Sequence, residues 1–155
     1  MPLQFHPYQL SYKEAVVDIF KSNCPKYFDV NDLQELNYFL NEHADDNFNI
    51  VSFKGEIIGC GGHYVKNEDQ TIGIAWVMFK RFSLGRRNFF QVADDFFEHI
   101  LESIRNEKLD FDIIINTTQL LEKTFNQYGF KTEQIIKDGF GSHLDHYRMR
   151  KRWAP

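Results

Sequence analysis

The sequence predicts a mixed α/β domain in which helices lie over a central mixed sheet. Three observations carry this prediction: apolar runs bounded by turn residues between 49 and 79, apolar residues at helical spacing on either side of them, and a strand–helix–strand pattern at Phe111–Phe130. With 155 residues, of which 43% are hydrophobic, the chain is large enough to bury a core. We therefore expect one domain over residues 1–155.

The chain before residue 48 predicts a short strand followed by two helices. Gln4–Pro7 is the strand, which its proline stops. Ser11 and Glu14 have the spacing of a capping box at the start of the first helix. Asp29 or Asn31 is expected to cap the second helix. The apolar faces of the two helices are expected at Ala15, Val16, Ile19 and Phe20, and at Leu33, Leu36, Phe39 and Leu40.

Three antiparallel strands and a long helix are expected next. Gly59, Gly61 and Gly62 weaken the second of these strands and indicate a bulge or close packing there. The helix runs from about Arg87 to Arg105 and has a wide apolar face. The strands are expected at 49–53, 57–65 and 71–79, with turns at 54–56 and 66–70 between them.

The stretch Phe111–Phe130 predicts a buried strand, a capped helix and a glycine stop. Residues 116–118 (Asn-Thr-Thr) follow the strand and supply short polar side chains for a helix cap. Gly129 ends the helix as a left-handed residue, and Phe130 returns to the core. Thr132–Ile136 and Leu144–Lys151 then form a last hairpin, with two glycines, 139 and 141, in its connection. The helical spacing is carried by Leu120, Leu121, Thr124, Phe125 and Tyr128.

Composition excludes several classes of protein. The net charge of −4 argues against a broad nucleic-acid surface. No apolar run approaches the roughly 20 residues that a membrane span needs, and Met1–Leu10 has no secretory signal pattern. Two cysteines without a Cys-x-x-Cys pattern favour a cytoplasmic protein with reduced thiols. The six histidines show no metal-binding spacing, so we expect no metal.

Residues 126–130 (Asn-Gln-Tyr-Gly-Phe), 117–119 (Thr-Thr-Gln) and 138–149 (Asp-Gly-Phe-Gly-Ser-His-Leu-Asp-His-Tyr-Arg-Met) carry a family resemblance. The first resembles the Tyr-Glu-Lys-x-Gly-Phe segment of the GNAT acyl-CoA N-acyltransferases. The others are similar to the Thr-Ser-Gln and the Asp-Gly-aromatic-Gly-x-x-Leu-Asp hairpin of a bacterial branch, in which Met stands four residues beyond the Asp. The resemblance spans the first strand to Met149 and implies a twisted sheet of about six or seven strands flanked by four helices.

The resemblance implies an N-acetyltransferase that moves an acetyl group from acetyl-coenzyme A directly to the amine of a small molecule or amino-acid-like acceptor, without a covalent enzyme intermediate. Such a transfer needs a polarised thioester carbonyl, a neutral amine and protonation of the leaving thiolate. The alternative is an acyl-CoA-binding module that has lost catalysis. The acceptor does not follow from the sequence, and a homodimer stays an open alternative.

Two segments correspond to the family's cofactor contacts. Val77, Met78 and Phe79 end a strand that splays from its neighbour in the family, so that its free backbone groups pair with the pantetheine arm; an ordinary strand end is the alternative. A degraded form of the family's pyrophosphate loop follows, in which Lys80-x-x-Ser83-x-Gly85 fits only loosely. A plain basic turn is its alternative. The loop residues expected near the phosphates, at a helix N-terminus, are Ser83, Gly85, Arg86 and Arg87.

Asn116 and Phe125 complete the expected cofactor site. Asn116 matches a position that often faces the cofactor, and a helix cap is its alternative role. Phe125 stands where the family commonly has a tyrosine that is proposed to protonate the thiolate, and a phenylalanine cannot donate a proton. This departure is what favours the alternative without catalysis.

Candidate catalytic residues must therefore be sought elsewhere. Tyr128 is a candidate acid, with a core position as its alternative. His63 and Asp145 are candidate bases, and each also has a structural interpretation. His146 and Tyr147 of the last hairpin can approach the same site. Around the second helix, an acidic cluster suits a cationic amine, with a solvated loop as the alternative: Glu35, Glu42, Asp45 and Asp46.

Overall fold

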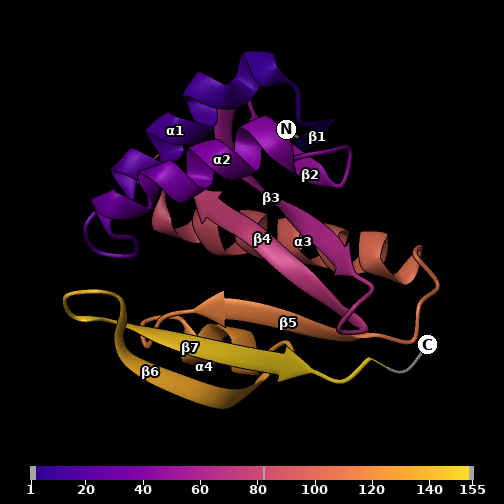
Figure 1. Cartoon of the computed structure of the whole chain (residues 1–155). Helices are drawn as coiled ribbons and strands as arrows, with labels where there is room; N and C mark the ends of the chain where they lie inside the picture. Colours follow the sequence, from indigo (N-terminus) through magenta and orange to yellow (C-terminus); the bar gives the residue numbers. More distant parts are fainter. Residues whose placement is uncertain (1–2, 82, 154–155) are drawn as a thin grey trace.

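The computed structural model describes residues 3–81 and 83–153, and of Arg86 only the backbone. These residues form a seven-stranded sheet in the order β1-β2-β3-β4-β5-β7-β6. Helices α1 and α2 cover one face, and α3 and α4 cover the other (Figure 1). The strands are β1 (Gln4–Pro7), β2 (Phe48–Phe53), β3 (Glu56–Lys66), β4 (Thr71–Phe79), β5 (Asp112–Thr117), β6 (Lys131–Gly141) and β7 (Leu144–Lys151). The helices are α1 (Lys13–Ser22), α2 (Leu33–Glu42), α3 (Arg86–Arg105) and α4 (Glu122–Asn126).

The predicted mixed sheet is confirmed. β2, β3 and β4 form the expected antiparallel meander, and β4 pairs with β5 in parallel. The four helices of the described residues lie where the apolar spacing predicts them, although α4 is shorter than expected. Among the described residues, no helix is both long and apolar enough to cross a membrane. Nor does that part of the chain gather three or more His, Cys, Asp or Glu side chains able to hold a metal ion.

Two apolar cores lie on the two faces of the sheet. The larger core packs α3 against β2 to β5 and β7, and its fully buried members include Phe96, Ile104 and Ile113. The smaller core packs α1 and α2 against β2, β3 and β4, with Phe20 and Leu36 at its centre. Burial of a side chain of this size contributes about 1.5–3 kcal/mol, so both layers contribute strongly to stability.

Two predicted helix starts are wrong. Ser11 lies in a 3₁₀ turn (Leu10–Tyr12) before α1, and the N-cap of α1 is Tyr12, which makes no side-chain cap. The chain therefore enters α1 through a tighter turn, which displaces the expected capping box. Asn116 lies inside β5, and α4 begins only at Glu122. The second helix fits better, because the Asp29 carboxylate accepts a hydrogen bond from the backbone N–H of Asn31 in the 3₁₀ turn before α2.

The glycines of β3 mark both a bulge and close packing, as the sequence predicts. Cys60 pairs with Met78 and Gly62 with Ala75, so that one residue of β3 faces two residues of β4. A Cβ at Gly62 would lie 2.1 Å from the carbonyl oxygen of Asn47, which leaves no room for a side chain. The expected left-handed stop at Gly129 is also present, with φ of +94°.

Candidate functional site

β4 and β5 separate from each other after a short paired segment. Their parallel register covers only three residue pairs and ends at Gly73 opposite Ile114. Beyond this point β4 continues beside β3, whereas β5 continues beside β7, so the sheet opens into a V (Figure 1). Within the described residues, no strand pairs with the β5-facing edge of β4 after Gly73. Backbone groups along that edge are therefore available to a ligand that lies in the V.

The β4 arm of the V contains a strained residue. Trp76 has φ of +48°, which a bulky side chain rarely adopts. It sits in the bulge opposite Gly61, where Trp76 and Val77 together face one residue of β3. The bulge sends Val77 toward the α3 core and Trp76 toward the α1/α2 core. Because such strain costs about 1–3 kcal/mol and concentrates at functional sites, it identifies this arm as a candidate site.

β4 leads directly into the N-terminus of α3. The end of the strand is held by α1, because the Asn23 side chain donates to the carbonyl oxygen of Phe79 at 2.9 Å. The N-cap of α3 is Gly85, and the first turn contains no acidic residue. Arg87 is exposed in this turn, and the Ser83 hydroxyl donates to the carbonyl oxygen of Lys80 at 2.6 Å. Free N–H groups with a neighbouring cation are suited to a phosphate anion, so the residues present fit the pyrophosphate of coenzyme A.

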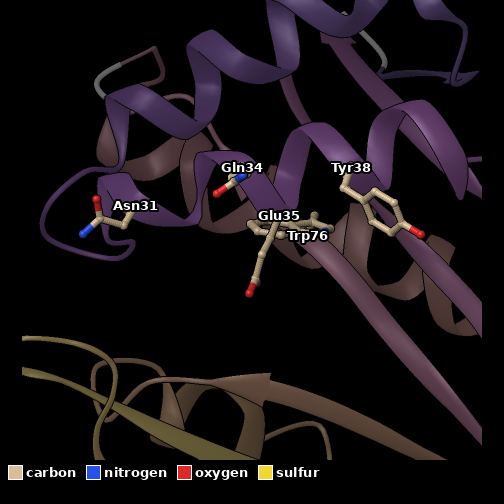
Figure 2. A pocket seen from close by; sticks show the side chains of 5 residues that line it. All are labelled: Asn31, Gln34, Glu35, Tyr38 and Trp76. Carbon is tan, nitrogen blue, oxygen red and sulfur yellow. The ribbon is translucent and has the colours of Figure 1, made fainter.

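An open cavity of about 590 Å³ lies between α2 and the V. Figure 2 shows Glu35 extending from α2 beside Trp76, with its carboxylate directed toward the last hairpin. Burial, together with the neighbouring carboxylates of Glu35 and Asp29, raises the pKa of Asp32 above its ordinary value. The cavity therefore combines an aromatic wall with negative charge. Its lining residues are Asn31, Gln34, Glu35, Tyr38 and Trp76.

The β5–β7–β6 arm presents polar side chains on the same face of the sheet as the cavity. The His146 ring nitrogen Nε2 lies 2.8 Å from Asn116 Oδ1, and the ring packs against that of Phe140, with the centroids 4.3 Å apart and the planes tilted by 31°. Farther along β7, Arg148 and Arg150 both bond Glu133 of β6. These two guanidinium groups lower the pKa of the Glu133 carboxyl.

The tip of the last hairpin reaches the loop between α1 and α2. A Cβ at Gly141 would lie 2.3 Å from the Asp29 carboxylate, so the backbone of the hairpin touches that side chain. Gln119 ties the other side of the hairpin, since it donates to the carbonyl oxygen of His143 and accepts from the N–H of Asp145. The hairpin thus bounds the space beneath α2.

The three predicted catalytic residues are not brought together. The Tyr128 hydroxyl donates to Asp94 of α3 at 2.6 Å, and burial and this carboxylate raise its pKa. His63 is buried on the α3 side, with Nε2 3.3 Å from Glu107. The Asp145 carboxylate accepts a hydrogen bond from the N–H of Asp138 across the hairpin. Each side chain thus has a partner outside the cavity beside α2.

The structure places some of the predicted cofactor residues at the V and buries another in the larger core. Val77, Met78 and Phe79 lie on the free arm of the V, as the resemblance implies. Asn116 faces the opening, where it bonds His146 instead of capping a helix. Phe125 is only 8% exposed and packs on Phe97 at 5.5 Å between ring centroids, so it is a member of the larger core.

Sequence reasoning did not predict the cavity beside α2. Tyr38 and Gln34 carry no motif, and Trp76 resembles any apolar strand residue. Its positive φ has no signature in the sequence because a left-handed tryptophan is exceptional. Glu35 belonged to the predicted acidic cluster, and that was the one available signal.

Comparison with known proteins identifies the fold. No family model and no curated protein sequence matches the chain. Solved structures do: a chain of the NatC complex bound to Gag peptide and CoA has a TM-score of 0.75 at 14% identity, over 99% of this chain and 100% of that one. Ard1 from Thermoplasma volcanium has 0.74 at 13%, over 100% of both chains. A GNAT family acetyltransferase from Elizabethkingia anophelis with acetyl-CoA bound has 0.71 at 13%, over 97% and 98%.

The chain is thus a mixed α/β protein, whose seven-stranded sheet contains one splayed parallel pair and is covered by helices on both faces. The fold of this chain is that of the GNAT acetyltransferases.

Proposed function

We infer that this protein is an N-acyltransferase that uses acetyl-coenzyme A and an amine acceptor. The observation that carries the inference is the V between β4 and β5, whose bulged arm leads into the N-terminus of α3. A thioester with a long amide-containing arm and a pyrophosphate needs both features, namely a free strand edge for its amides and helix N–H groups for its phosphates. Transfer then moves the acetyl group from the thioester to the amine of the acceptor.

On this proposal three parts of the chain bind the substrates: two of them bind the cofactor, and the cavity beside α2 binds the acceptor. The backbone of Val77, Met78 and Phe79 binds the pantetheine arm and polarises the thioester carbonyl. The first turn of α3, with Arg87 and the loop residues Ser83 and Gly85, binds the pyrophosphate. Arg86 belongs to this loop in the sequence, and its side chain lies outside the described residues.

The cavity beside α2 receives the acceptor on this proposal. Its volume of about 590 Å³ lies within the range of small-molecule sites, ~300–1,000 Å³. Glu35 supplies a carboxylate that attracts an ammonium group, and Trp76 supplies an aromatic face for it. A small amine or an amino-acid-like molecule is the class of acceptor that we propose.

Transfer in this site does not depend on a side-chain acid at Phe125. A coenzyme A thiol resembles a free cysteine, whose pKa is about 8.5, so its thiolate can leave near neutral pH. Positioning of the two reactants alone supplies about 7–11 kcal/mol of the barrier. On this proposal, Phe125 makes the transfer slower than a tyrosine at this position would, but it does not prevent the transfer.

A second candidate function is binding of acyl-CoA without transfer. It is favoured by one observation, which is that Phe125 packs into the larger core and brings no hydroxyl to the V. Both candidates require the cofactor site, so binding alone does not separate them. Release of free thiol in the presence of amines does.

The test combines calorimetry with a thiol-release assay. Acetyl-CoA is expected to bind below millimolar concentration, and one or more members of a library of small amines and amino acids is expected to release thiol faster than buffer. Absence of binding at millimolar acetyl-CoA refutes both candidates. Binding without release for every amine selects the binding module.

A matched pair of variants locates the cofactor. Arg87→Glu reverses the charge at the start of α3 and is expected to weaken acetyl-CoA binding about tenfold or more, because it adds repulsion to a lost attraction. Arg152→Glu makes the same charge change at an exposed residue after β7 and is expected to leave affinity within about twofold. Equal affinities for the two variants would place the pyrophosphate elsewhere.

A further inference from the structure

Asn116 of β5 and His146 of β7 form a polar pair on the β5–β7–β6 arm of the V. We propose that His146 is the general base of the acyl transfer and that Asn116 is its positioning residue. The proposal rests on the function proposed above. His146 is thereby assigned contact with the acceptor amine, and Asn116 acts through the imidazole ring.

The register of the strands places the pair just beyond the point where the V opens. β4 and β5 part after Gly73, and a small hollow at this point is lined by Gly73, Tyr64 and Asn116. Asn116 pairs with Arg148 and Thr117 with Tyr147, so His146 lies two residues farther from the paired end than Asn116 does. Between the two arms, β4 beyond Gly73 has no strand partner on its β5-facing edge among the described residues, so a cofactor arm that lies along this edge passes beside the pair.

The alternation of side chains places the pair on the acceptor side. Ile115 and Met149 are buried in the larger core on the α3/α4 face, and Tyr147 packs against that core. Successive strand residues point to opposite faces, so Asn116 and His146 project from the face that α1 and α2 cover on the other arm. Trp76 projects from the same face of β4 into the cavity beside α2.

The contacts of the ring leave one nitrogen available. Asn116 Oδ1 lies 2.8 Å from Nε2, and a carbonyl oxygen accepts only, so Nε2 carries the proton. Nδ1 then holds the lone pair, and no hydrogen bond to the described residues occupies it. Packing against the ring of Phe140, at 4.3 Å between centroids, restricts the movement of the imidazole. A base needs this arrangement of a fixed tautomer and a free lone pair.

The charges around the ring favour its neutral form. Burial, and next the positive charge of Arg148, lower the pKa of His146 below its ordinary value. β5 presents Asn116 and β6 presents Phe140, and neither titrates. From the other side of the cleft, Glu35 directs its carboxylate toward the last hairpin, and the Asp29 carboxylate lies against Gly141 of that hairpin. At neutral pH the imidazole is therefore unprotonated and able to accept a proton.

The proton balance of the step is simple. The acceptor enters as an ammonium ion, and its first proton passes to Nδ1 of His146 and then to solvent. The neutral amine attacks the thioester carbonyl, the C–N bond forms, and the C–S bond breaks. The second N–H proton leaves with the thiolate, which gives the thiol and the amide. No oxidant or further reactant is needed.

The first experiment removes the base. His146→Gln is expected to lower kcat/KM at pH 7 by about 10²–10⁴-fold with the amine that gives the fastest release, while the acetyl-CoA affinity stays within about twofold of its original value. His143→Asn is the control, because His143 is an exposed turn residue of the same hairpin whose φ of +65° an asparagine adopts readily. It is expected to retain turnover.

The pH profile separates a base from a structural residue. Below neutral pH, kcat/KM of the original protein is expected to fall as His146 becomes protonated, at a pH below the ordinary histidine value of about 6.5. Asn116→Asp places a carboxylate on the ring, raises the pKa of His146 and is expected to shift this fall to higher pH. In His146→Gln the rate is expected to rise about tenfold per pH unit as free amine forms.

A second measurement does not depend on turnover. Nitrogen NMR of His146 is expected to show the Nε2–H tautomer at pH 7 in the original protein and a mixture of tautomers in Asn116→Ala. A proton on Nδ1, or unchanged turnover and pH profile in His146→Gln, overturns the proposal while the transferase function stands. No thiol release by the original protein with any amine overturns the transferase function itself, and the base with it.

Discussion

The two faces of the sheet differ in how far their apolar cores extend. On the α3/α4 face the core runs from β2 to β7 without a break. On the α1/α2 face the core ends at β4, and β5, β7 and β6 carry polar side chains next to an open cavity. Apolar burial contributes far more than exposed ion pairs, which contribute about 0–1 kcal/mol each. The difference agrees with the proposed function, in which one face stabilises the protein and the other carries the acyl transfer.

The largest effect is expected from truncating a side chain of the larger core. Phe96 is 0% exposed, stacks on Phe5 and meets the ring of Phe79 edge-on. Phe96→Ala is expected to lower the free energy of unfolding by about 3–5 kcal/mol, because it removes transfer energy and leaves a cavity. Phe90→Ala, at a residue of the same helix that is 64% exposed, is expected to change it by less than about 0.5 kcal/mol. Urea denaturation measures both, and similar losses would contradict the proposed division.

A smaller loss is expected from overpacking beside the bulge. Gly62→Ala puts a methyl group 2.1 Å from the backbone of Asn47 and is expected to destabilise the protein by about 1–3 kcal/mol. Gly85→Ala is the control for stability, since its Cβ meets nothing within 4 Å and its φ is −66°. Thermal unfolding compares the two. A larger loss for Gly85→Ala would show that the sheet has more freedom at the bulge than the packing indicates.

The proposed role of the cavity beside α2 is tested by removing one of its charges. Glu35→Gln keeps the size of the side chain and is expected to raise KM for a cationic amine about fivefold, because it removes one partly solvated attraction worth roughly 1 kcal/mol. Glu42→Gln changes an exposed carboxylate at the end of the same helix and is expected to leave KM unchanged. Steady-state kinetics at fixed acetyl-CoA make the comparison. A rise in the KM for acetyl-CoA instead would assign this cavity to the cofactor.

The sequence predicted the fold well because its elements have strong local signals. Thr71–Phe79 and Gln4–Pro7 were predicted with the bounds that the structure has, since turn residues flank them. The helix starts failed where a 3₁₀ turn or a longer strand competed with a polar cap, as at Ser11 and Asn116. Local propensity does not decide such competitions, because packing of the following residues does.

The candidate site was predicted only where it lies on a continuous segment. Val77–Phe79 and the start of α3 follow from their position in the order of elements. The pairing of Asn116 with His146 joins residues thirty positions apart, and it depends on the register of β5 and β7. No periodicity reports such a register, so the structure was needed to select His146 among the six histidines.

The smallest expected effect concerns Tyr128, which was predicted as an acid. It packs against the larger core, with its ring centroid 4.5 Å from that of Phe97, and its hydroxyl donates a hydrogen bond to Asp94. Tyr128→Phe keeps the ring and removes one hydrogen bond, so we expect a loss of about 1 kcal/mol in unfolding free energy. Turnover is expected to stay within about twofold, since the pKa of this hydroxyl is raised and its proton is held by Asp94. Thiol release and urea denaturation of the same preparation measure the two quantities. Abolished turnover with unchanged acetyl-CoA affinity and stability would show that Tyr128 is the acid, and that the chemistry is shared between the two faces of the sheet.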